Sequence, residues 1–133
     1  HRYNPKLKIA YGNFELFEKK FKIPLEKKII AFSGIGLPEK FFNFLKKLKI
    51  KPLKTYSFSD HHQYTNQELE TLAQFAKKNN AILLTTSKDF TKIVELSNYK
   101  SFKKIIFEVP VFIRFSNHKS MISLIKKIYY AKN

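Results

Sequence analysis

The chain has 133 residues, of which 44% are hydrophobic, so it is long enough for one domain with a core and too short for two ordinary domains. It contains no cysteine, which excludes disulfides, thiolate metal sites and cysteine nucleophiles, and no apolar run approaches the ~20 residues of a membrane span. The formal net charge is +16, but lysine supplies nearly all of it, and the specific nucleic-acid binding that relies on arginine is not expected.

The excess of lysine is open to more than one explanation. A basic surface is typical of proteins that bind nucleic acid, and it equally suits an anionic membrane face or an anionic lipid. Lysine-rich composition on solvated helix faces gives the same charge without any partner. A non-enzymatic basic module, binding nucleic acid or an anionic lipid surface, therefore stays open as an alternative to an enzyme.

Strands and helices alternate along the first half of the chain. The predicted strands of this half are a weak extended region at residues 7–18, an apolar run at Lys27–Ser33, and Leu53–Phe58. A helix is predicted over about 37–49, because apolar residues recur there at the spacing of one helical face and Pro38 suits a first turn.

The second half continues the alternation. Thr65 and Glu68 form a capping box that begins a helix, and Asn79-Asn80 ends it. The strands predicted here are Ala81–Thr85, Lys104–Val109 and Val111–Phe115, with Pro110 between the last two.

Two further helices complete the prediction. Ser87 is expected to cap a short one that turns Phe90, Ile93 and Val94 inward. The last one, capped by Ser116 or Asn117, carries its apolar residues on one face: Met121, Ile125, Ile128 and Tyr129. Alternating strands and helices favour an α/β fold, a mostly parallel sheet flanked by helices, whose strand order the sequence does not define. We expect residues 1–133 to form a single α/β domain.

The first motif that could carry chemistry is Gly34-Ile35-Gly36, between a predicted strand and a predicted helix. Glycine lets a ligand approach the backbone closely, and a helix N-terminus favours an anion, so Gly34 and Gly36 are possible substrate or phosphate contacts. A tight turn that needs small residues explains the same motif. It is neither a Walker loop nor a dinucleotide fingerprint, since no Gly-Lys-Ser/Thr and no third spaced glycine follow.

Asp60-His61-His62 lies between a predicted strand end and a capped helix, where ligands of α/β sheets gather. A carboxylate beside an imidazole raises the basicity of the ring, which suits removal of a proton from a hydroxyl group. A surface turn is the alternative. The same triplet marks manganese phosphoesterases, but the chain has only ten acidic residues and lacks the further carboxylates that such a metal site needs.

The third motif, Thr85-Thr86-Ser87-Lys88-Asp89, also follows a predicted strand. Lys88 is a possible phosphate contact, and Asp89 a possible acceptor for a backbone or partner hydrogen bond. Ordinary helix capping by Ser87, with Asp89 favourable in the first turn, explains the pattern equally well.

Taken together and in this order, the motifs resemble the C-terminal half of the lipid A 4′-kinases (tetraacyldisaccharide 4′-kinases). The resemblance rests on three stretches: Ala31–Gly36 with Pro38, Phe41 and Phe42; Phe58–Thr65; and Leu84–Asp89. It covers about Ile29 to Ile93, roughly half of the chain.

The resemblance implies a kinase that transfers the γ-phosphate of ATP to the 4′-hydroxyl of a tetraacyldisaccharide 1-phosphate, a lipid A precursor, with Mg²⁺, at the cytoplasmic face of the bacterial inner membrane. It implies that the ATP site is a P-loop in an N-terminal half absent from this chain, which begins at His1. This chain alone is therefore expected to bind neither ATP nor Mg²⁺ well and to have little activity. The implied partners are the lipid precursor, an anionic membrane surface and the P-loop half.

By the same resemblance, His61 activates the hydroxyl and Asp60 is its immediate partner. His62, Tyr64, Lys88 and Asp89 match motif positions and are possible substrate or phosphate contacts, without a defined role. One departure concerns Ser87, which stands where the family usually has glutamate, so any role that needs that acid is in doubt. No residue of the chain is predicted to bind a metal.

Overall fold

The computed structural model describes residues 12–17, 21–24 and 26–115, together with residues 119, 122, 123 and 126. The chain divides into two compact units. The smaller unit contains most of a two-stranded sheet, formed by β1 (Gly12–Leu16) and β6 (Val111–Phe115). In this sheet Arg114 Nε lies 2.7 Å from Glu15 Oε1. The predicted final helix, with Met121, Ile125, Ile128 and Tyr129, lies outside the described residues.

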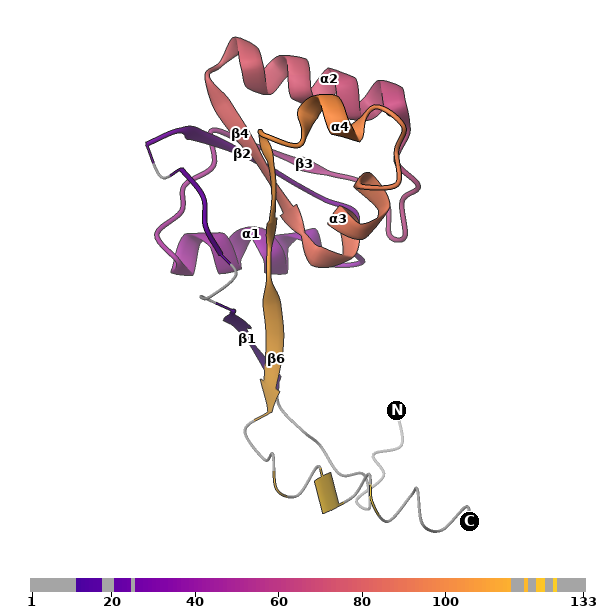
Figure 1. The fold of residues 1–133 in the computed structure, drawn as a ribbon. Coiled ribbons are helices and arrows are strands. Elements are labelled where there is room, and N and C mark those ends of the chain that lie inside the picture. The colour runs from indigo at the N-terminus through magenta and orange to yellow at the C-terminus, as the bar shows by residue number, and fades with distance from the viewer. Residues whose placement is uncertain are drawn as a thin grey trace. The chain divides into compact units, whose positions relative to one another are not determined.

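The larger unit, Leu16–Val111, contains a four-stranded sheet (Figure 1). Its strands are β2 (Lys28–Ser33), β3 (Lys54–Ser57), β4 (Ala81–Thr86) and β5 (Ile106–Val109). Their order is β3-β2-β4-β5, and every neighbouring pair is parallel. The prediction of an α/β fold with a mostly parallel sheet is confirmed, and the structure adds the strand order.

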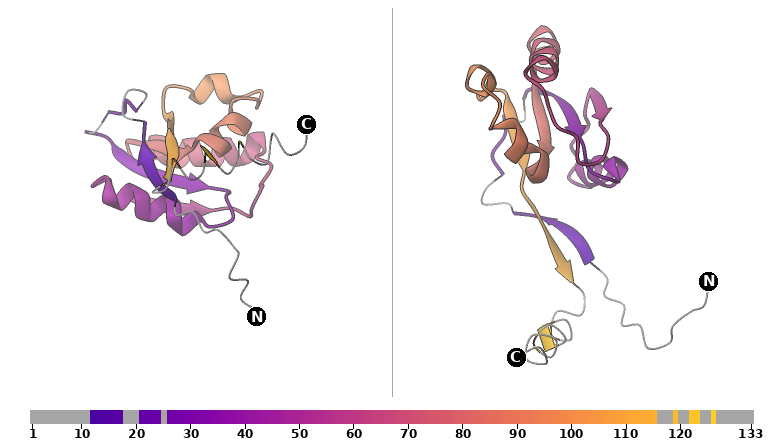
Figure 2. Two further views of the ribbon diagram at one scale, coloured as in Figure 1. Left: turned by 90° about the horizontal axis from the view of Figure 1, so that it is seen from below. Right: turned by 90° about the vertical axis from the view of Figure 1, so that its right-hand side faces the viewer.

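Helices cover both faces of this sheet, as the views in Figures 1 and 2 show. On one face, α1 (Pro38–Lys47) packs Phe41 and Leu45 against the alternate β2 residues Ile29 and Ala31. The opposite face of β2 packs against α2 (Asn66–Lys78), with further contributions from α3 (Ser87–Ile93) and the short α4 (Tyr99–Phe102). The near-continuous burial of β2 and β4 follows from this double cover.

The predicted start of α2 is confirmed in detail. The hydroxyl of Thr65 accepts a hydrogen bond from the Glu68 N–H at 3.2 Å, and the Glu68 carboxylate accepts one from the Thr65 N–H at 2.8 Å. The helix ends at Lys78, and Asn80 takes a positive φ of 51° just beyond it. Local capping chemistry alone therefore defines both ends of α2.

Two expectations about α3 are wrong. Its N-cap is Thr86 rather than Ser87, because β4 runs one residue further and the Thr86 hydroxyl accepts the Asp89 N–H at 3.1 Å. Val94 is 39% exposed and does not face the core, because α3 ends one residue before it. The α4 turn was not predicted, since four residues carry no periodicity.

The strand order places a switch point between β2 and β4. The chain passes from β2 through α1 to β3 on one side, and then through α2 to β4 on the other side of β2. The two crossover helices therefore lie on opposite faces, and the loops that leave β2 and β4 diverge at the carboxyl ends of those strands. In open α/β sheets, ligands bind at such a point.

Candidate functional site

Three loops meet at the carboxyl ends of β2, β3 and β4. The Phe58 N–H donates to the Ser33 carbonyl at 2.9 Å, which joins the end of β3 to the end of β2. The Gly34 N–H donates to Asp89 Oδ2 at 3.0 Å, which joins β2 to α3. The structure thus brings together the residues of the three sequence motifs, which lie far apart along the chain.

Asp89 is the buried centre of this junction, with no exposed surface. Its Oδ2 accepts hydrogen bonds from the Gly34 N–H, from the Ser33 hydroxyl at 3.2 Å and from the Thr86 hydroxyl at 2.7 Å. A buried carboxylate is tolerated only with such partners. Burial raises the pKa of the Tyr64 hydroxyl, and the nearby Asp89 carboxylate raises it further, so Tyr64 stays neutral.

Crowding, rather than backbone conformation, explains the two glycines, because neither has a positive φ. A Cβ at Gly34 would lie 3.0 Å from His62 Cβ, 3.1 Å from the Tyr64 hydroxyl and 3.3 Å from Asp89 Oδ1. A Cβ at Gly36 would lie 3.1 Å from Asp60 Oδ2. Both glycines therefore leave room for the side chains of the next two loops.

His61 is the exposed member of the histidine pair, with 72% of its side chain accessible. Its φ is 57°, a left-handed conformation that few residues with side chains adopt. Its N–H faces two acceptors, Asp60 Oδ1 at 2.9 Å and the Gly34 carbonyl at 3.1 Å. Asp60 thus holds the His61 backbone, while its Oδ2 lies 3.8 Å from the ring Nε2, a distance for charge attraction to a protonated ring.

Lys88 completes the exposed group at this edge. Its Nζ lies 3.9 Å from Asp60 Oδ1, and about half of each side chain is accessible. Asp60, His61 and Lys88 therefore present a carboxylate, an imidazole and an ammonium group to solvent. Such a set can accept a proton from a hydroxyl and attract a phosphate.

His62 has a different environment from His61. Its ring stacks on Phe58 with centroids 4.7 Å apart, meets Tyr64 edge-on at 4.9 Å, and its Nε2 lies 3.0 Å from Glu68 Oε1. Burial by itself would raise the pKa of Glu68, but hydrogen bonds from the Thr65 backbone and from His62 lower it overall. The ring of His62 is thus engaged in packing and pairing.

Four residues of this network were not singled out as site residues from the sequence: Ser33, Glu68, Thr86 and Lys92. In the sequence, Glu68 and Thr86 stand out only as capping or motif residues. Lys92 could have been found by one feature: it lies four residues after Lys88 on a short helix, so both side chains are on the same helical face. Lys92 Nζ donates to the His62 carbonyl at 2.8 Å.

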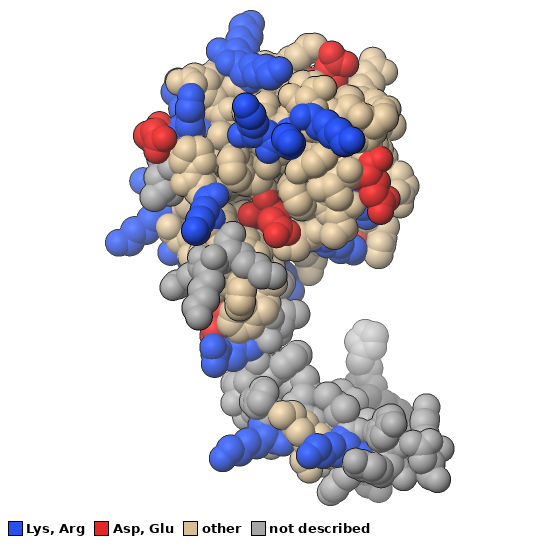
Figure 3. Space-filling model, in the orientation of Figure 1, with Lys and Arg blue, Asp and Glu red and all other residues tan. Residues whose placement is uncertain are grey.

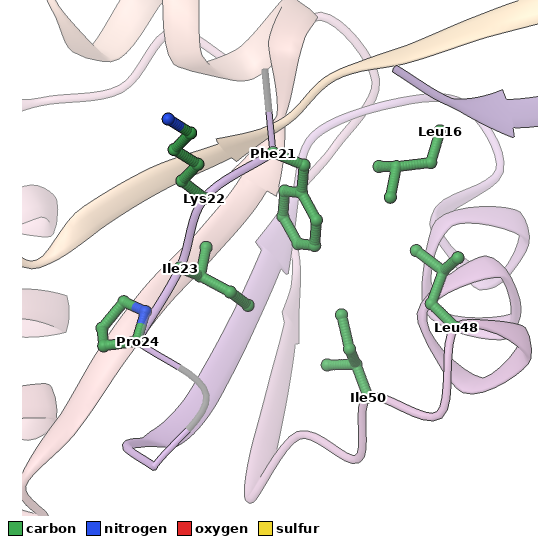
Figure 4. A pocket seen from close by; sticks show the side chains of 7 residues that line it. All are labelled: Leu16, Phe21, Lys22, Ile23, Pro24, Leu48 and Ile50. Atoms are coloured by element: carbon green, nitrogen blue, oxygen red, sulfur yellow. The ribbon is translucent and has the colours of Figure 1, made fainter. Parts of the chain in front are cut away.

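An apolar hollow lies away from this site, at the opposite end of α1 (Figure 4). It encloses about 620 Å³ and is lined by Leu16, Phe21, Lys22, Ile23, Pro24, Leu48 and Ile50. Since α1 runs back from the carboxyl edge to the start of β3, the hollow does not belong to the histidine loop.

The described part of the chain contains no group of three histidine or acidic side chains that could hold a metal ion. Within the same residues, no helix has both the length and the apolar character to cross a membrane. Lysine and arginine side chains are spread over much of the surface shown in Figure 3.

Comparison with known proteins decides the family. A model of the tetraacyldisaccharide-1-P 4′-kinase family matches residues 3–130, nearly the whole chain. The chain belongs to this family. The tetraacyldisaccharide 4′-kinase of Bartonella quintana is 44% identical over 86 residues, which are 64% of this chain and 25% of that protein. The enzyme of Rickettsia bellii is 45% identical over 76 residues, 57% of this chain and 24% of that protein.

A solved structure shares the fold of this tetraacyldisaccharide 4′-kinase family member. LpxK from Aquifex aeolicus, crystallised in complex with ATP, superimposes with a TM-score of 0.55 at 24% identity, covering 98% of this chain and 39% of that one. By the two sequence matches above, the chain spans about a quarter of the length of these curated relatives. The family match confirms the resemblance inferred from the motifs.

Proposed function

We propose that this chain is the C-terminal part of a kinase that transfers the γ-phosphate of ATP to the 4′-hydroxyl of a tetraacyldisaccharide 1-phosphate. Family membership supports the reaction, and the exposed His61 beside Asp60 at the carboxyl edge of the sheet supports the location. In this proposal a ring nitrogen of His61 accepts the proton of the sugar hydroxyl as that oxygen attacks the γ-phosphorus, and the bond from the γ-phosphorus to the bridging oxygen breaks, so that ADP leaves. The neighbouring Asp60 carboxylate stabilises the imidazolium that results.

Lys88 fits the second requirement of phosphoryl transfer, charge neutralisation. Its ammonium group is half exposed and 3.9 Å from Asp60, so it can swing toward a phosphate without losing a buried contact. Gly34 and Gly36 lie against the residues that carry these side chains. Gly36 packs against Asp60, and Gly34 packs against the buried Tyr64 and Asp89. His62 contributes through packing.

We assign ATP and Mg²⁺ to the remainder of the protein. No Gly-Lys-Ser/Thr loop occurs in this sequence, and the described residues offer no cluster of three histidine or acidic side chains for a metal ion. The P-loop part of the family would present the nucleotide to the histidine edge. The remaining partners in this proposal are the lipid A disaccharide precursor and the anionic cytoplasmic face of the inner membrane, which the lysine excess suits.

A product analysis tests the proposed reaction. The complete protein, given ATP labelled in its γ-phosphate and tetraacyldisaccharide 1-phosphate in detergent micelles, is expected to form a labelled bisphosphate with the new phosphate on the 4′-oxygen. Phosphorus and proton NMR of the product identify that position. Label transfer to water alone, or to another hydroxyl, would contradict the proposal.

A further inference from the structure

The histidine turn, Ser59–His62, holds His61 in an unfavourable backbone conformation. The His62 N–H donates to the Ser59 carbonyl at 3.1 Å, which closes the turn, and His61 occupies its third position with φ 57°. A type II turn requires this sign of φ there and therefore prefers glycine or asparagine. Strain of this kind persists only where the surroundings hold the backbone in place.

Helix α3 supplies those surroundings through three side chains. Lys88 faces the Asp60 carboxylate at 3.9 Å, and Asp89 binds the Gly34 N–H at 3.0 Å. Lys92, one helical turn after Lys88, donates to the His62 carbonyl at 2.8 Å. These three side chains thus contact Asp60, which precedes His61, Gly34, whose carbonyl accepts the His61 N–H, and His62, which follows His61.

The contacts of Asp89 and Lys92 with the histidine turn differ in kind. Asp89 acts through Gly34, whose carbonyl accepts the His61 N–H at 3.1 Å. Lys92 binds the carbonyl of His62, the last residue of the turn, so it holds the peptide group between His62 and Gln63, where the chain leaves the turn. Lys92 is also partly buried, which strengthens its charged hydrogen bond relative to one in water.

We infer that Lys92 is a positioning residue of the proposed kinase reaction: its ammonium group locks the histidine turn so that the His61 ring faces the substrate hydroxyl. The inference rests on the proposed function of His61. It adds to that function a residue outside the three motifs, and it gives α3 the role of a clamp over the turn.

Kinetics of the complete enzyme test this inference. Lys92→Met keeps the aliphatic stem and removes the donor, so kcat is expected to fall about 10- to 100-fold while KM for ATP is unchanged, because a small misplacement of a reacting group is costly. Lys92→Arg retains a donor and should recover most of the loss. Lys100→Met, an exposed lysine on α4, is the matched control and should leave kcat unchanged.

A double mutant separates positioning from general support of the fold. If Lys92 acts through His61, Lys92→Met should lower kcat no further in a His61→Ala background. A full additional loss in that background would show that Lys92 acts elsewhere. If kcat is normal in Lys92→Met but reduced in His61→Ala, the inference about Lys92 is wrong and the proposed site stands. If kcat is undiminished in His61→Ala, the proposed site is wrong as well.

Amide hydrogen exchange gives a readout that does not depend on activity. In the complete protein, Lys92→Met should speed exchange at the His61 and His62 N–H groups about 10-fold. The His62 N–H closes the turn that Lys92 holds, and the His61 N–H joins that turn to Gly34. Lys100→Met should not change them. Equal exchange at both amides in Lys92→Met and the unmodified protein would contradict the clamp.

Discussion

Replacing His61 with alanine in the complete enzyme is expected to lower kcat about 100- to 10,000-fold, the range that a positioned general base contributes. The side chain is 72% accessible, so its removal should change the melting temperature little. Steady-state kinetics with the lipid substrate, alongside thermal unfolding, provide the measurement.

His62→Ala is the matched control for that result. Its ring stacks on Phe58 and pairs with Glu68, so its loss should lower stability more than His61→Ala does and kcat less. The loss of kcat in Asp60→Asn should lie between the losses in these two variants, because an amide oxygen can still accept the His61 N–H while the negative charge beside the ring is lost. The reverse ranking of the two histidines would show that the proton acceptor is His62.

Gly34→Ala is expected to have the second largest effect. The new methyl group would meet His62 Cβ at 3.0 Å, an atom close to the backbone that cannot swing away, together with the Tyr64 hydroxyl and Asp89 Oδ1. Overpacking of this kind typically costs about 1–3 kcal/mol, and relief requires the histidine loop to move away from β2. Both the free energy of unfolding and kcat should therefore fall.

Gly36→Ala serves as the comparison for Gly34→Ala. The three atoms nearest to its methyl group all belong to the Asp60 carboxylate, the first at 3.1 Å, and that side chain is half exposed and can rotate. Chemical denaturation should show a smaller loss of stability than for Gly34→Ala, with a change in kcat through the displaced Asp60. Equal stability of the two variants would mean that the packing around Gly34 is loose.

Most secondary structure followed from the sequence because its signals are local. The Thr65–Glu68 capping box, the proline in the first turn of α1 and the apolar runs of β2 and β4 each depend on neighbours within a few residues. The strand order does not depend on such local neighbours. It depends on whether β3 and β4 each lie on one side of β2 or on the other, which no local signal defines. The cap of α3 was misplaced because Thr86 and Ser87 are chemically equivalent, and only the end of β4 distinguishes them.

The site was predictable as a set of motifs but not as a network. Residue type alone marks Asp60-His61-His62 as a candidate site, but it does not separate an exposed His61 from a packed His62. That difference arises from Phe58, Tyr64 and Glu68, which surround one ring and not the other. Similarly, the link from Asp89 to Gly34 joins residues 55 positions apart.

The central claim is that the lipid substrate meets this part of the protein at the carboxyl edge of the sheet, around the histidine turn. Hydrogen exchange of the complete protein, with and without tetraacyldisaccharide 1-phosphate in matched micelles, tests it directly. We expect slower exchange in the presence of the lipid at residues 34–37 and 59–63, and no change at residues 48–54, which lie at the opposite end of α1. Protection confined to residues 48–54, with unchanged exchange around His61, would contradict the account.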